Sequence, residues 1–334
     1  MAKRRLTAYC SRTPVEGISK ILTNPPLSQR GQCSHYRDAM AAIAIVVVTY
    51  NSEACVGDLL DSLVGCGADS VVVVDNGSSD ATVRIVEGHD RVTLVRSANV
   101  GYAGGINRGV RATPDADAYL ILNPDLVVHP GLVGALTAAL AESRVGLAVP
   151  LVLDSDGRRQ DSLRREQSLL RAVGLNWTGL PLLSEYVKGD GEYSAARDVD
   201  WALGAAVMFS RSCYEAIGPW DESFFLYSEE TDFCLRARDA GWRTRFVPEA
   251  VVVHHGGGSG RNDATHVMQV VNRVRLYARR HSKPAGYAYF ALNVLSELSW
   301  IARGRKQSRA SVRGLLLPHT RPPELGCAQS LLPR

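Results

Sequence analysis

The sequence predicts an α/β fold: a mostly parallel sheet flanked by helices. Two observations carry this prediction. Short β-branched apolar runs alternate with helical patterns, and three of these runs end in polar, turn-forming clusters. Such runs are typical of strands buried on both faces of a parallel sheet, and their alternation with helices implies right-handed βαβ crossovers. Ligands bind such sheets at the carboxyl ends of the strands, so the polar clusters are expected to meet at one edge.

The first half of the chain shows this alternation most clearly. Strands are expected at 43–49, 70–74, 92–95 and 119–122. After the first strand, Ser52 is placed to cap a helix with one apolar face, and Gly65 and Gly67 follow its end. That face consists of Val56, Leu59, Leu60 and Leu63. A short helix to about Glu87 follows the second strand.

The middle of the chain is less regular. Pro130 suits the first position of a helix, and a strand is expected at 145–149. The helix would turn three leucines inward: Leu132, Leu136 and Leu140. From Asp154 to Asp198 the pattern is that of a loop. We expect this loop to expose Arg158, Arg159, Arg164 and Arg165.

Regular structure is expected again from Asp200 onward. The predicted elements are a strand at 207–210, a helix at about 228–240 that Gly241 ends, and strand-like runs at 242–247 and 251–253. A basic helix follows them. It contains Asn272, Arg273, Arg275 and Arg279.

We interpret the chain as one domain with a C-terminal extension. Its 334 residues are 46% hydrophobic, enough to bury a large core, and no linker splits them. Residues 1–40 are expected to be disordered, 41–283 to form the domain, and 284–334 to form a basic helical extension with a flexible tail. The net charge is +4. Basic residues gather at both ends of the chain, where they could face phosphate or anionic lipid, or only solvent.

Cysteine usage and hydropathy indicate the compartment. The seven cysteines are scattered and form no CxxC pair, which indicates reduced thiols in a cytosolic protein. No apolar run is long enough to span a membrane. The aromatic-rich segment 287–301 is interrupted by Asn293 and Glu297, so it is interpreted either as a helix on a membrane surface or as a cap on the domain.

The fourth predicted strand ends in Asn123-Pro124-Asp125. This corner delivers a carboxylate to the edge of the sheet. Mg²⁺ and Mn²⁺ take oxygen ligands and commonly use one or two protein carboxylates together with phosphate oxygens. His254 or His255, at a later strand end, could add an imidazole ligand. The alternatives are an Asx-Pro turn and a surface histidine.

Two further segments have both a structural and a functional interpretation. Asp75 precedes Asn-Gly, which signals a tight turn, but an acidic residue at a strand end could also bind a nucleobase or ribose. The glycines from Gly101 to Gly109 allow a close backbone approach to a phosphate or sugar, although loose glycine-rich turns are common. No dinucleotide-binding glycine fingerprint follows the first strand.

Three acidic residues crowd the first turn of the helix predicted at 228–240: Glu229, Glu230 and Asp232. The helix dipole favours negative charge there, which is the structural interpretation. They also follow four large apolar residues, 224–227, whose surroundings would desolvate a carboxylate and raise its pKa toward the range of a general base.

Taken together, these blocks resemble the family 2 glycosyltransferases of the GT-A type. The resemblance runs in order through 46–51, 73–80, 99–109, 122–125, 224–232 and 254–259, and spans about 43–281. Within the family, the last two blocks and the segment 201–206 look most like bacterial rhamnosyltransferases, including actinobacterial enzymes that act on polyprenyl-diphospho-GlcNAc. The resemblance implies a GT-A fold with a Rossmann-like sheet.

The resemblance also implies roles for individual residues. Glu230 would be the base, with Glu229 as second choice and Asp232 in the same acidic motif. Asp125 and His254, preferred to His255, would bind the divalent cation. The implied donor-binding residues are Thr49, Asn51, Asp75, Asn76, Gly104, Asn107, Asn123 and Asp125, and the implied acceptor-binding residues are Trp201, Gly204 and Ala205. This chain departs from the family pattern in having Asn at 123 and Glu at 230, where Asp is more frequent.

The predicted function is an inverting, metal-dependent transfer of a sugar from a nucleoside diphosphate donor, with dTDP-rhamnose as first choice. The acceptor would be a glycan or a polyprenyl-linked sugar in cell-wall or polysaccharide synthesis, reached in the cytoplasm or at the inner face of the plasma membrane. UDP-hexose or GDP-mannose donors, a nucleotidyltransferase and a catalytically silent sugar-binding protein are the alternatives. We expect no nucleic-acid partner, and the oligomeric state is left open.

Overall fold

The structure is a computed structural model of the chain, and it describes residues 42–175, 178, 180–256, 262–325 and 331–332. The disorder expected for 1–40 and the glycine-rich loop after Gly256 lie outside the described residues, apart from Gly256 itself. Within this part of the chain, no helix is long and apolar enough to cross a membrane. The four cysteines that it includes are free thiols.

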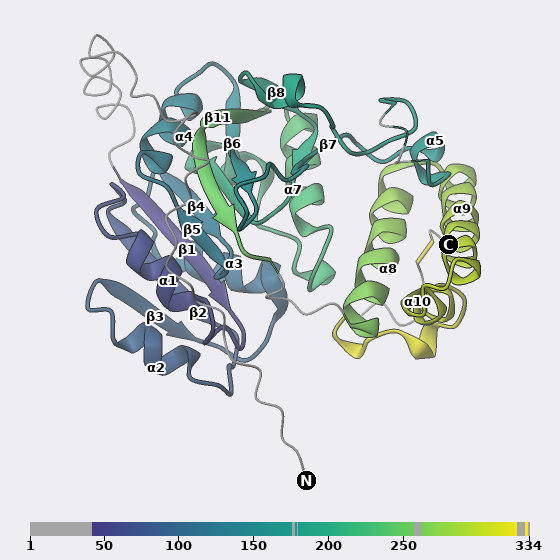
Figure 1. Cartoon of the computed structure of the whole chain (residues 1–334), viewed down its shortest axis with the longest axis horizontal. Coiled ribbons are helices and arrows are strands. Elements are labelled where there is room, and N and C mark those ends of the chain that lie inside the picture. The colour runs from purple at the N-terminus through teal and green to yellow at the C-terminus, as the bar shows by residue number, and fades with distance from the viewer. Residues whose placement is uncertain (1–41, 176–177, 179, 257–261, 326–330, 333–334) are drawn as a thin grey trace.

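A nine-stranded mixed sheet forms the centre of the molecule (Figure 1). Its main path runs β3-β2-β1-β4-β10-β6-β11-β5, and β8 pairs with β11. The neighbours from β3 to β4 are parallel, as are β6 and β11, whereas β10, β5 and β8 run antiparallel to their neighbours. The strands are β1 (Ile43–Thr49), β2 (Ser70–Asp75), β3 (Val92–Arg96), β4 (Ala118–Leu122), β5 (Leu126–Val128), β6 (Val145–Leu153), β8 (Arg197–Val199), β10 (Ala206–Ser210) and β11 (Arg243–His254). The predicted α/β fold with a mostly parallel sheet is confirmed.

Helices cover both faces of the sheet. In chain order the helices of the described residues are α1 (Val56–Ser62), α2 (Thr82–Glu87), α3 (Gly101–Ala112), α4 (Leu132–Leu140), α5 (Leu169–Ala172), α6 (Arg211–Ile217), α7 (Glu229–Asp239), α8 (Asp263–Arg280), α9 (Lys283–Ala302) and α10 (Gln307–Leu316). Of these, α5, α8, α9 and α10 form a bundle beside the sheet (Figure 1). Single 3-10 turns occur at Asp190–Tyr193, Glu222–Phe224, Pro318–Thr320 and Pro323–Leu325. A separate two-stranded sheet joins β7 (Leu163–Arg164) to β9 (Trp201–Ala202).

The alternation of side chains along β1 produces two cores. Ile43, Ile45 and Val47 face the core that includes residues of α1 and α4. Ala44, Val46 and Val48 face the opposite core, which includes residues of α3 and α7. This is the period-2 pattern of a strand buried on both faces. A third apolar cluster joins α8, α9 and α10 and includes Ala172 of α5.

Several local expectations were wrong. Ser52 does not cap α1: the helix begins at Val56, and the Ser52 carbonyl accepts hydrogen bonds from the Cys55 and Val56 backbone amides in the preceding turn. Helix α4 begins at Leu132 rather than at Pro130, because Gly131 takes a left-handed φ of 89°.

Two further expectations also need correction. Arg164 is not exposed. Arg164 lies in β7, where it pairs with Trp201 of β9, and it retains 7% exposure.

The glycine-rich block is a helix, α3, rather than a loose loop. Its glycines allow the helix to approach β1 closely. A Cβ at Gly105 would lie 2.5 Å from the Val48 side chain, and one at Gly109 would lie 2.2 Å from the Val46 side chain. The close backbone approach made by these two glycines is therefore to the sheet.

Candidate active site

The carboxyl ends of β1 and β2 meet, as the sequence predicts, and Asp75 lies between them. The Thr49 hydroxyl donates to Asp75 Oδ1 at 3.0 Å, and the Ser78 hydroxyl donates to the same oxygen. The backbone amides of Gly77 and Ser78 donate to Oδ2 at 3.1 and 3.0 Å. A carboxylate offers about four acceptor sites, so this turn satisfies the buried Asp75.

Two asparagines at the same strand ends fix the neighbouring segments. Asn51 has a positive φ of 51°, and its side-chain oxygen accepts from the Ser79 amide at 2.8 Å. The Asn76 amide donates to the Gly101 carbonyl at 2.9 Å and thereby holds the start of α3. Thr49, Asn51, Asp75 and Asn76 thus form one rigid rim at the edge of the sheet.

Tyr102 links the strand ends to the acidic helix. Its hydroxyl donates to Asn123 Oδ1 at 2.7 Å and lies 3.2 Å from the Gly204 carbonyl oxygen. Burial raises the pKa of Tyr102 well above its usual range, and the charges of Glu229, Glu230 and Asp125 add to the effect. The Tyr102 hydroxyl thus joins Asn123, at the end of β4, to Gly204, which contacts Glu230.

Glu229 and Glu230 begin α7 beside this tyrosine. Glu229 retains 3% exposure, and the Oε2 atoms of both residues have no hydrogen-bond partner within the described part of the chain. Burial, followed by the charge of Glu230, raises the pKa of Glu229 well above its usual range. Burial also raises the pKa of Glu230, although helix-terminal amides and Arg164 oppose the rise.

The segment before α7 is strained. Phe225, Tyr227 and Ser228 have positive φ values of 52°, 67° and 75°, which L-residues rarely adopt. The side-chain amide of Asn272 on α8 donates to the carbonyls of Phe224, Leu226 and Tyr227 at 2.6, 2.9 and 3.1 Å. Asn272 is fully buried, so α8 holds the loop that presents the acid pair.

α3 supports the same loop from the other side. The Tyr102 amide donates to the Phe225 carbonyl at 2.6 Å. A Cβ at Gly101 would lie 2.3 Å from that carbonyl oxygen, and Gly101 itself has a φ of 79°. Glycine is therefore required here, where two backbones touch.

Asp125 and His254 meet where β11 pairs with β5. His254 Nε2 lies 3.3 Å from Asp125 Oδ1. On the other side of the ring, Nδ1 lies 3.3 Å from Gln160 Oε1, and the Gln160 amide nitrogen donates to the His254 carbonyl, which fixes the orientation of that amide. The proton of a neutral His254 therefore sits on Nδ1, and the Nε2 lone pair faces a carboxylate oxygen. Two facing acceptors suit a cation between them.

His255 faces elsewhere. Its Nδ1 lies 2.9 Å from the Ser155 hydroxyl, and its backbone amide donates to the Asp125 carbonyl at 3.0 Å. The geometry thus favours His254 over His255 beside the carboxylate. Among the described residues, no group of three or more His, Cys, Asp or Glu side chains is arranged to hold a metal ion, so protein ligands beyond this pair are not found there.

Three residues implied for the site are engaged in other contacts. Asp232 pairs with Arg236 at 2.7 Å, one helical turn along α7. The buried Asn107 amide binds the Trp220 backbone and Glu222. A Cβ at Gly104 would meet the side chain of Val100 at 2.8 Å. These contacts hold α3 and α7 in place, and they do not bring the three residues to the acid pair.

The implied acceptor residues form one wall of the site. A Cβ at Gly204 would lie 3.2 Å from Glu230 Cβ, so the two residues are in contact. The buried Ala205 accepts a hydrogen bond from the Asn123 amide through its carbonyl at 2.8 Å. Trp201 donates from Nε1 to the Arg165 carbonyl at 3.0 Å. Only Gly204 touches the acid pair directly.

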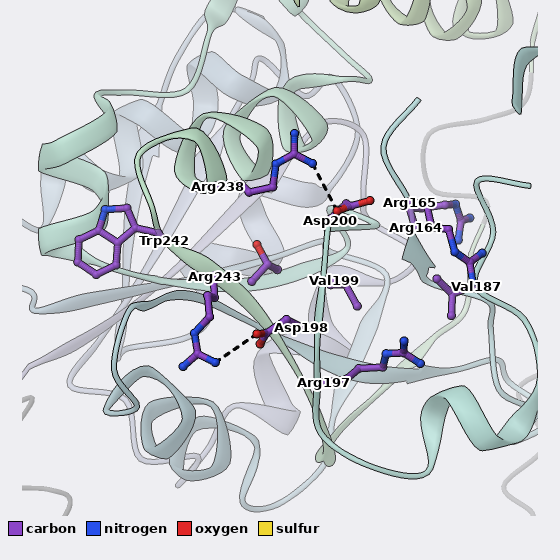
Figure 2. Close-up of a pocket in the computed structure, with 11 residues that line it drawn as sticks. Arg164, Arg165, Val187, Arg197, Asp198, Val199, Asp200, Arg238, Trp242 and Arg243 are labelled. Atoms are coloured by element: carbon purple, nitrogen blue, oxygen red, sulfur yellow. Dashed lines mark hydrogen bonds and ion pairs between the residues drawn. The ribbon is translucent and has the colours of Figure 1, made fainter. Parts of the chain in front are cut away.

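An arginine-lined pocket of about 330 Å³ lies next to this wall (Figure 2). Arg238 pairs with Asp200, and Arg243 with Asp198. The pocket is also lined by Arg164, Arg165 and Arg197. The hydrogen bonds that the structure describes for the Arg164 and Arg165 guanidinium groups go to backbone carbonyls, not to carboxylates. The lining of this pocket therefore carries more positive than negative side chains.

Comparison with known proteins identifies the family. The model of the family described as "Glycosyltransferase like family 2" matches residues 41–275. The chain is a family 2 glycosyltransferase. The N-acetylglucosaminyl-diphospho-decaprenol L-rhamnosyltransferase of Mycobacterium tuberculosis is 34% identical over 233 residues, which cover 64% of this glycosyltransferase and 76% of the relative.

Of two other curated relatives, one is named for a different activity and the other has a lower sequence identity. The low-salt glycan biosynthesis hexosyltransferase Agl10 of Haloferax volcanii is 33% identical over 211 residues, covering 62% of this chain and 64% of Agl10. The rhamnosyltransferase WbbL of Escherichia coli is 24% identical over 237 residues, covering 66% and 86%. The resemblance to bacterial rhamnosyltransferases is therefore confirmed.

Solved structures show the same fold. GalNAc-T7, solved with UDP, GalNAc and Mn²⁺, superposes with a TM-score of 0.57 at 15% identity, over 82% of this chain and 56% of that one. Staphylococcus aureus TarS, solved with UDP-GlcNAc, gives a TM-score of 0.52 at 14% identity, over 86% and 83%. The GT-A fold implied by the sequence is confirmed.

Sequence reasoning missed three residues of the site. Tyr102 lies within the glycine-rich block, and the glycine pattern gives no signal for the role of its hydroxyl. Arg164 was assigned to an exposed loop. Asn272 was noted only as part of a basic helix, although an asparagine among Met268, Val271 and Val274 signals a buried amide that needs partners.

Proposed function

We propose that this glycosyltransferase moves rhamnose from a nucleoside diphosphate donor, dTDP-rhamnose as first choice, to a hydroxyl of a polyprenyl-diphosphate-linked glycan, with inversion. The observation that carries the proposal is the acid pair, Glu229 and Glu230, whose buried Oε2 atoms have no hydrogen-bond partner among the described residues, beside Tyr102 at the carboxyl ends of the strands. The name of the mycobacterial relative supports rhamnose as the sugar and a polyprenyl-diphosphate-linked glycan as the acceptor.

The chemical step requires one base. Glu230 is assigned this role because it contacts Gly204 on the acceptor wall. Its carboxylate takes the proton of the acceptor hydroxyl while that oxygen attacks the anomeric carbon. The bond from this carbon to the diphosphate oxygen breaks, and the nucleoside diphosphate leaves with the electron pair. Because attack and departure occur on opposite faces, the configuration inverts.

The rim and the Asp125–His254 pair are assigned to the donor. Thr49, Asn51 and Asn76 with Asp75 would line the nucleoside, and Asn123 would lie near the diphosphate. The facing Asp125 and His254 acceptors fit Mg²⁺ or Mn²⁺, which they would hold together with phosphate oxygens. Such a cation would neutralise charge on the leaving diphosphate.

The acceptor side is assigned to the arginine-lined pocket and to the wall from Trp201 to Ala205. Arg164 and Arg165, which have no carboxylate partner in the described part of the chain, suit the diphosphate of a polyprenyl-linked acceptor. Such an acceptor places the enzyme in the cytoplasm, at the inner face of the membrane. We also propose residues 41–283 as the catalytic domain and 284–334 as an extension.

The test replaces each acid by its amide and measures release of nucleoside diphosphate with Mn²⁺ present. Glu230→Gln should lower transfer by about 10²–10⁴-fold, the usual contribution of a general base, and leave donor binding intact. Glu229→Gln, the matched control, should lose much less. Chelation of divalent cations should stop transfer by the unaltered enzyme. Full transfer by Glu230→Gln would refute the assignment of the base.

A second candidate keeps the reaction and changes the sugar. The Haloferax relative is named a hexosyltransferase, which supports a UDP-hexose or GDP-mannose donor. The same assay across dTDP-rhamnose, UDP-glucose, UDP-galactose and GDP-mannose separates these donors. A nucleotidyltransferase would release pyrophosphate instead, and a silent sugar-binding protein would release nothing.

A further inference from the structure

Helix α9 is oriented with its polar side chains inward. Its buried face carries Tyr289, Asn293 and Glu297. Glu297 lies 3.1 Å from His266, and the Tyr289 hydroxyl accepts from Arg273 at 2.8 Å. A surface helix normally buries its apolar stripe and exposes its polar one. α9 departs from this arrangement, because Asn293 and Glu297 are buried beside Tyr289 while apolar residues remain on its outer face. Phe290, Leu292 and Val294 pack against the apolar cluster of the bundle.

The outer face of α9 is apolar. Tyr287, Leu295 and Leu298 are 54%, 61% and 45% exposed, and the small Ala288, Ala291 and Ala302 are exposed between them. Helical spacing places these residues on one side of the helix. No charged side chain interrupts this side from Tyr287 to Ala302, because the single acidic residue of α9, Glu297, is buried.

The carboxyl end of α9 adds an aromatic and basic border. Trp300 is 37% exposed, and the guanidinium groups of Arg303 and Arg305 lie 4.7 and 5.1 Å from the centre of its ring. Lys306, Arg309 and Arg313 are exposed nearby on and before α10. The structure describes no ion pair for any of these five basic residues. Between 283 and 320 the sequence holds no acidic residue except Glu297.

A neighbouring helix extends the apolar face. α5 packs against α9, and a Cβ at Gly174 would lie 3.5 Å from the Ser296 hydroxyl. Ser296 lies next to Leu295, and Leu170 of α5 and Val173, which directly follows α5, are about half exposed. The exposed apolar residues of α9 and α5 with the basic border are called the α9 surface below.

We propose that the α9 surface binds an anionic membrane, with α9 lying in the plane of the interface. A helix with an apolar outer face, a tryptophan at its edge and unpaired arginines beside it has the chemistry of an interfacial membrane helix. Its apolar residues would enter the acyl boundary, and the cations would meet lipid phosphates. The proposal rests on the proposed function, which puts the enzyme at the inner face of the membrane, and deepens it by assigning the surface that makes the contact.

The charges favour lipid over a second copy of this chain. A second copy packed on the same surface would bring no exposed carboxylate to Arg303, Arg305, Lys306, Arg309 and Arg313 from its own α9 surface, because Glu297 is buried. Like charges would gather there instead. An anionic bilayer offers both an apolar layer and a counter-charge.

The test measures partition of the full chain into vesicles without any nucleotide sugar. Vesicles contain equal parts of phosphatidylglycerol and phosphatidylcholine, or phosphatidylcholine alone. Each cation near an anionic surface strengthens binding about five-fold, so Arg303→Gln with Arg305→Gln should weaken partition into the anionic vesicles about 25-fold. Leu295→Glu with Leu298→Glu should weaken it at least about ten-fold.

Val64→Glu is the matched control, because Val64 is an exposed apolar residue on another part of the chain and its replacement should leave partition unchanged. Release of nucleoside diphosphate without membrane should be the same in all variants, so a failure of the proposed function would appear there and not in partition. Equal binding to both vesicle types, or unchanged binding by the two double variants, would overturn the proposal. So would a dimer in solution that the leucine variant dissociates while vesicle binding is absent.

Discussion

Asp75 and the acid pair Glu229 and Glu230 lie at the same edge of the sheet, but they differ in how far their carboxylate oxygens are hydrogen-bonded. Asp75 accepts hydrogen bonds from Thr49, Gly77 and Ser78, all within its own turn and the adjacent strand. Glu229 is buried and Glu230 is partly buried, and the buried Oε2 atom of each has no hydrogen-bond partner among the described residues. Asp75 stabilises the site, whereas the acid pair costs stability.

The difference follows from where each group lies along the chain. Asp75 ends a parallel strand, where free backbone amides of the next turn point back toward it. The acid pair follows a strained loop, and its position depends on α3 and α8, two helices distant in sequence. Groups left unsatisfied in this way are typical of residues that act on a substrate. Three predictions sharpen this contrast.

The largest effect is expected at the support of the strained loop. Asn272→Ala removes the amide that binds the carbonyls of Phe224, Leu226 and Tyr227. The loop should relax and misplace Glu230, and a shift of about 1 Å can cost about 10²-fold in rate. Turnover should therefore fall about 10²-fold, while donor binding at the rim stays unchanged. Steady-state kinetics with separate donor titration measures both.

Asn293→Ala is the matched control for this prediction, since Asn293 is also a buried amide of the helical bundle but donates within its own helix. It should lower stability without a specific loss of turnover. If both variants lose turnover equally, the role of Asn272 is merely structural. If Asn272→Ala keeps full turnover, the loop does not need this support.

The sequence predicted the fold because its parallel strands are locally encoded. The run at 43–49 has the β-branched composition of a strand buried on both faces, and β1 has those bounds. The antiparallel direction of β10 was not predicted, since periodicity does not report direction. The regular structure between 154 and 198 was missed as well. β7 is two residues long and is stabilised by pairing with β9, which lies about 40 residues away in sequence. A strand this short depends on packing against its neighbours rather than on its own sequence.

The candidate site likewise contains residues that the sequence predicted and residues that it did not. The motif order placed the rim, Asp125 and the acid pair at one edge, because parallel strands end together. The choice between His254 and His255 depended on which ring faces Asp125, and only the pairing of β11 with β5 decides that. Arg164 and Asn272 act through contacts across distant segments, which no local pattern encodes.

A smaller effect is expected from Asp75→Asn. The neutral amide keeps the size of the side chain but weakens the bonds from Thr49, Gly77 and Ser78, since hydrogen bonds to charged groups contribute about 1.5–3 kcal/mol. The free energy of unfolding should fall by about that amount. Urea unfolding measures the loss, and Asp58→Asn on α1 is the control, because the structure describes no hydrogen bond to its side chain. Unchanged stability in Asp75→Asn would contradict the view of Asp75 as a satisfied anchor of the rim.

The smallest effect is a gain in stability from Glu229→Gln. Burial and the charge of Glu230 raise the pKa of Glu229 in the folded state well above its unfolded value. The folded chain therefore binds this proton more tightly, and its contribution to stability is fully present below the unfolded pKa and lost as pH rises through the folded pKa. Glutamine carries no charge to bury, so at pH above the raised pKa the variant should be about 1 kcal/mol more stable.

Urea unfolding at two pH values tests the sign of this effect. The gain should vanish near pH 4, where Glu229 is protonated in the folded chain and largely so in the unfolded one. Glu249→Gln, at an exposed position of β11, should show no such dependence on pH. A gain that is the same at both pH values would mean that better packing, and not the buried charge, distinguishes the variant. The acid pair would then cost the fold no more than Asp75 does, and the contrast between the two groups would fail.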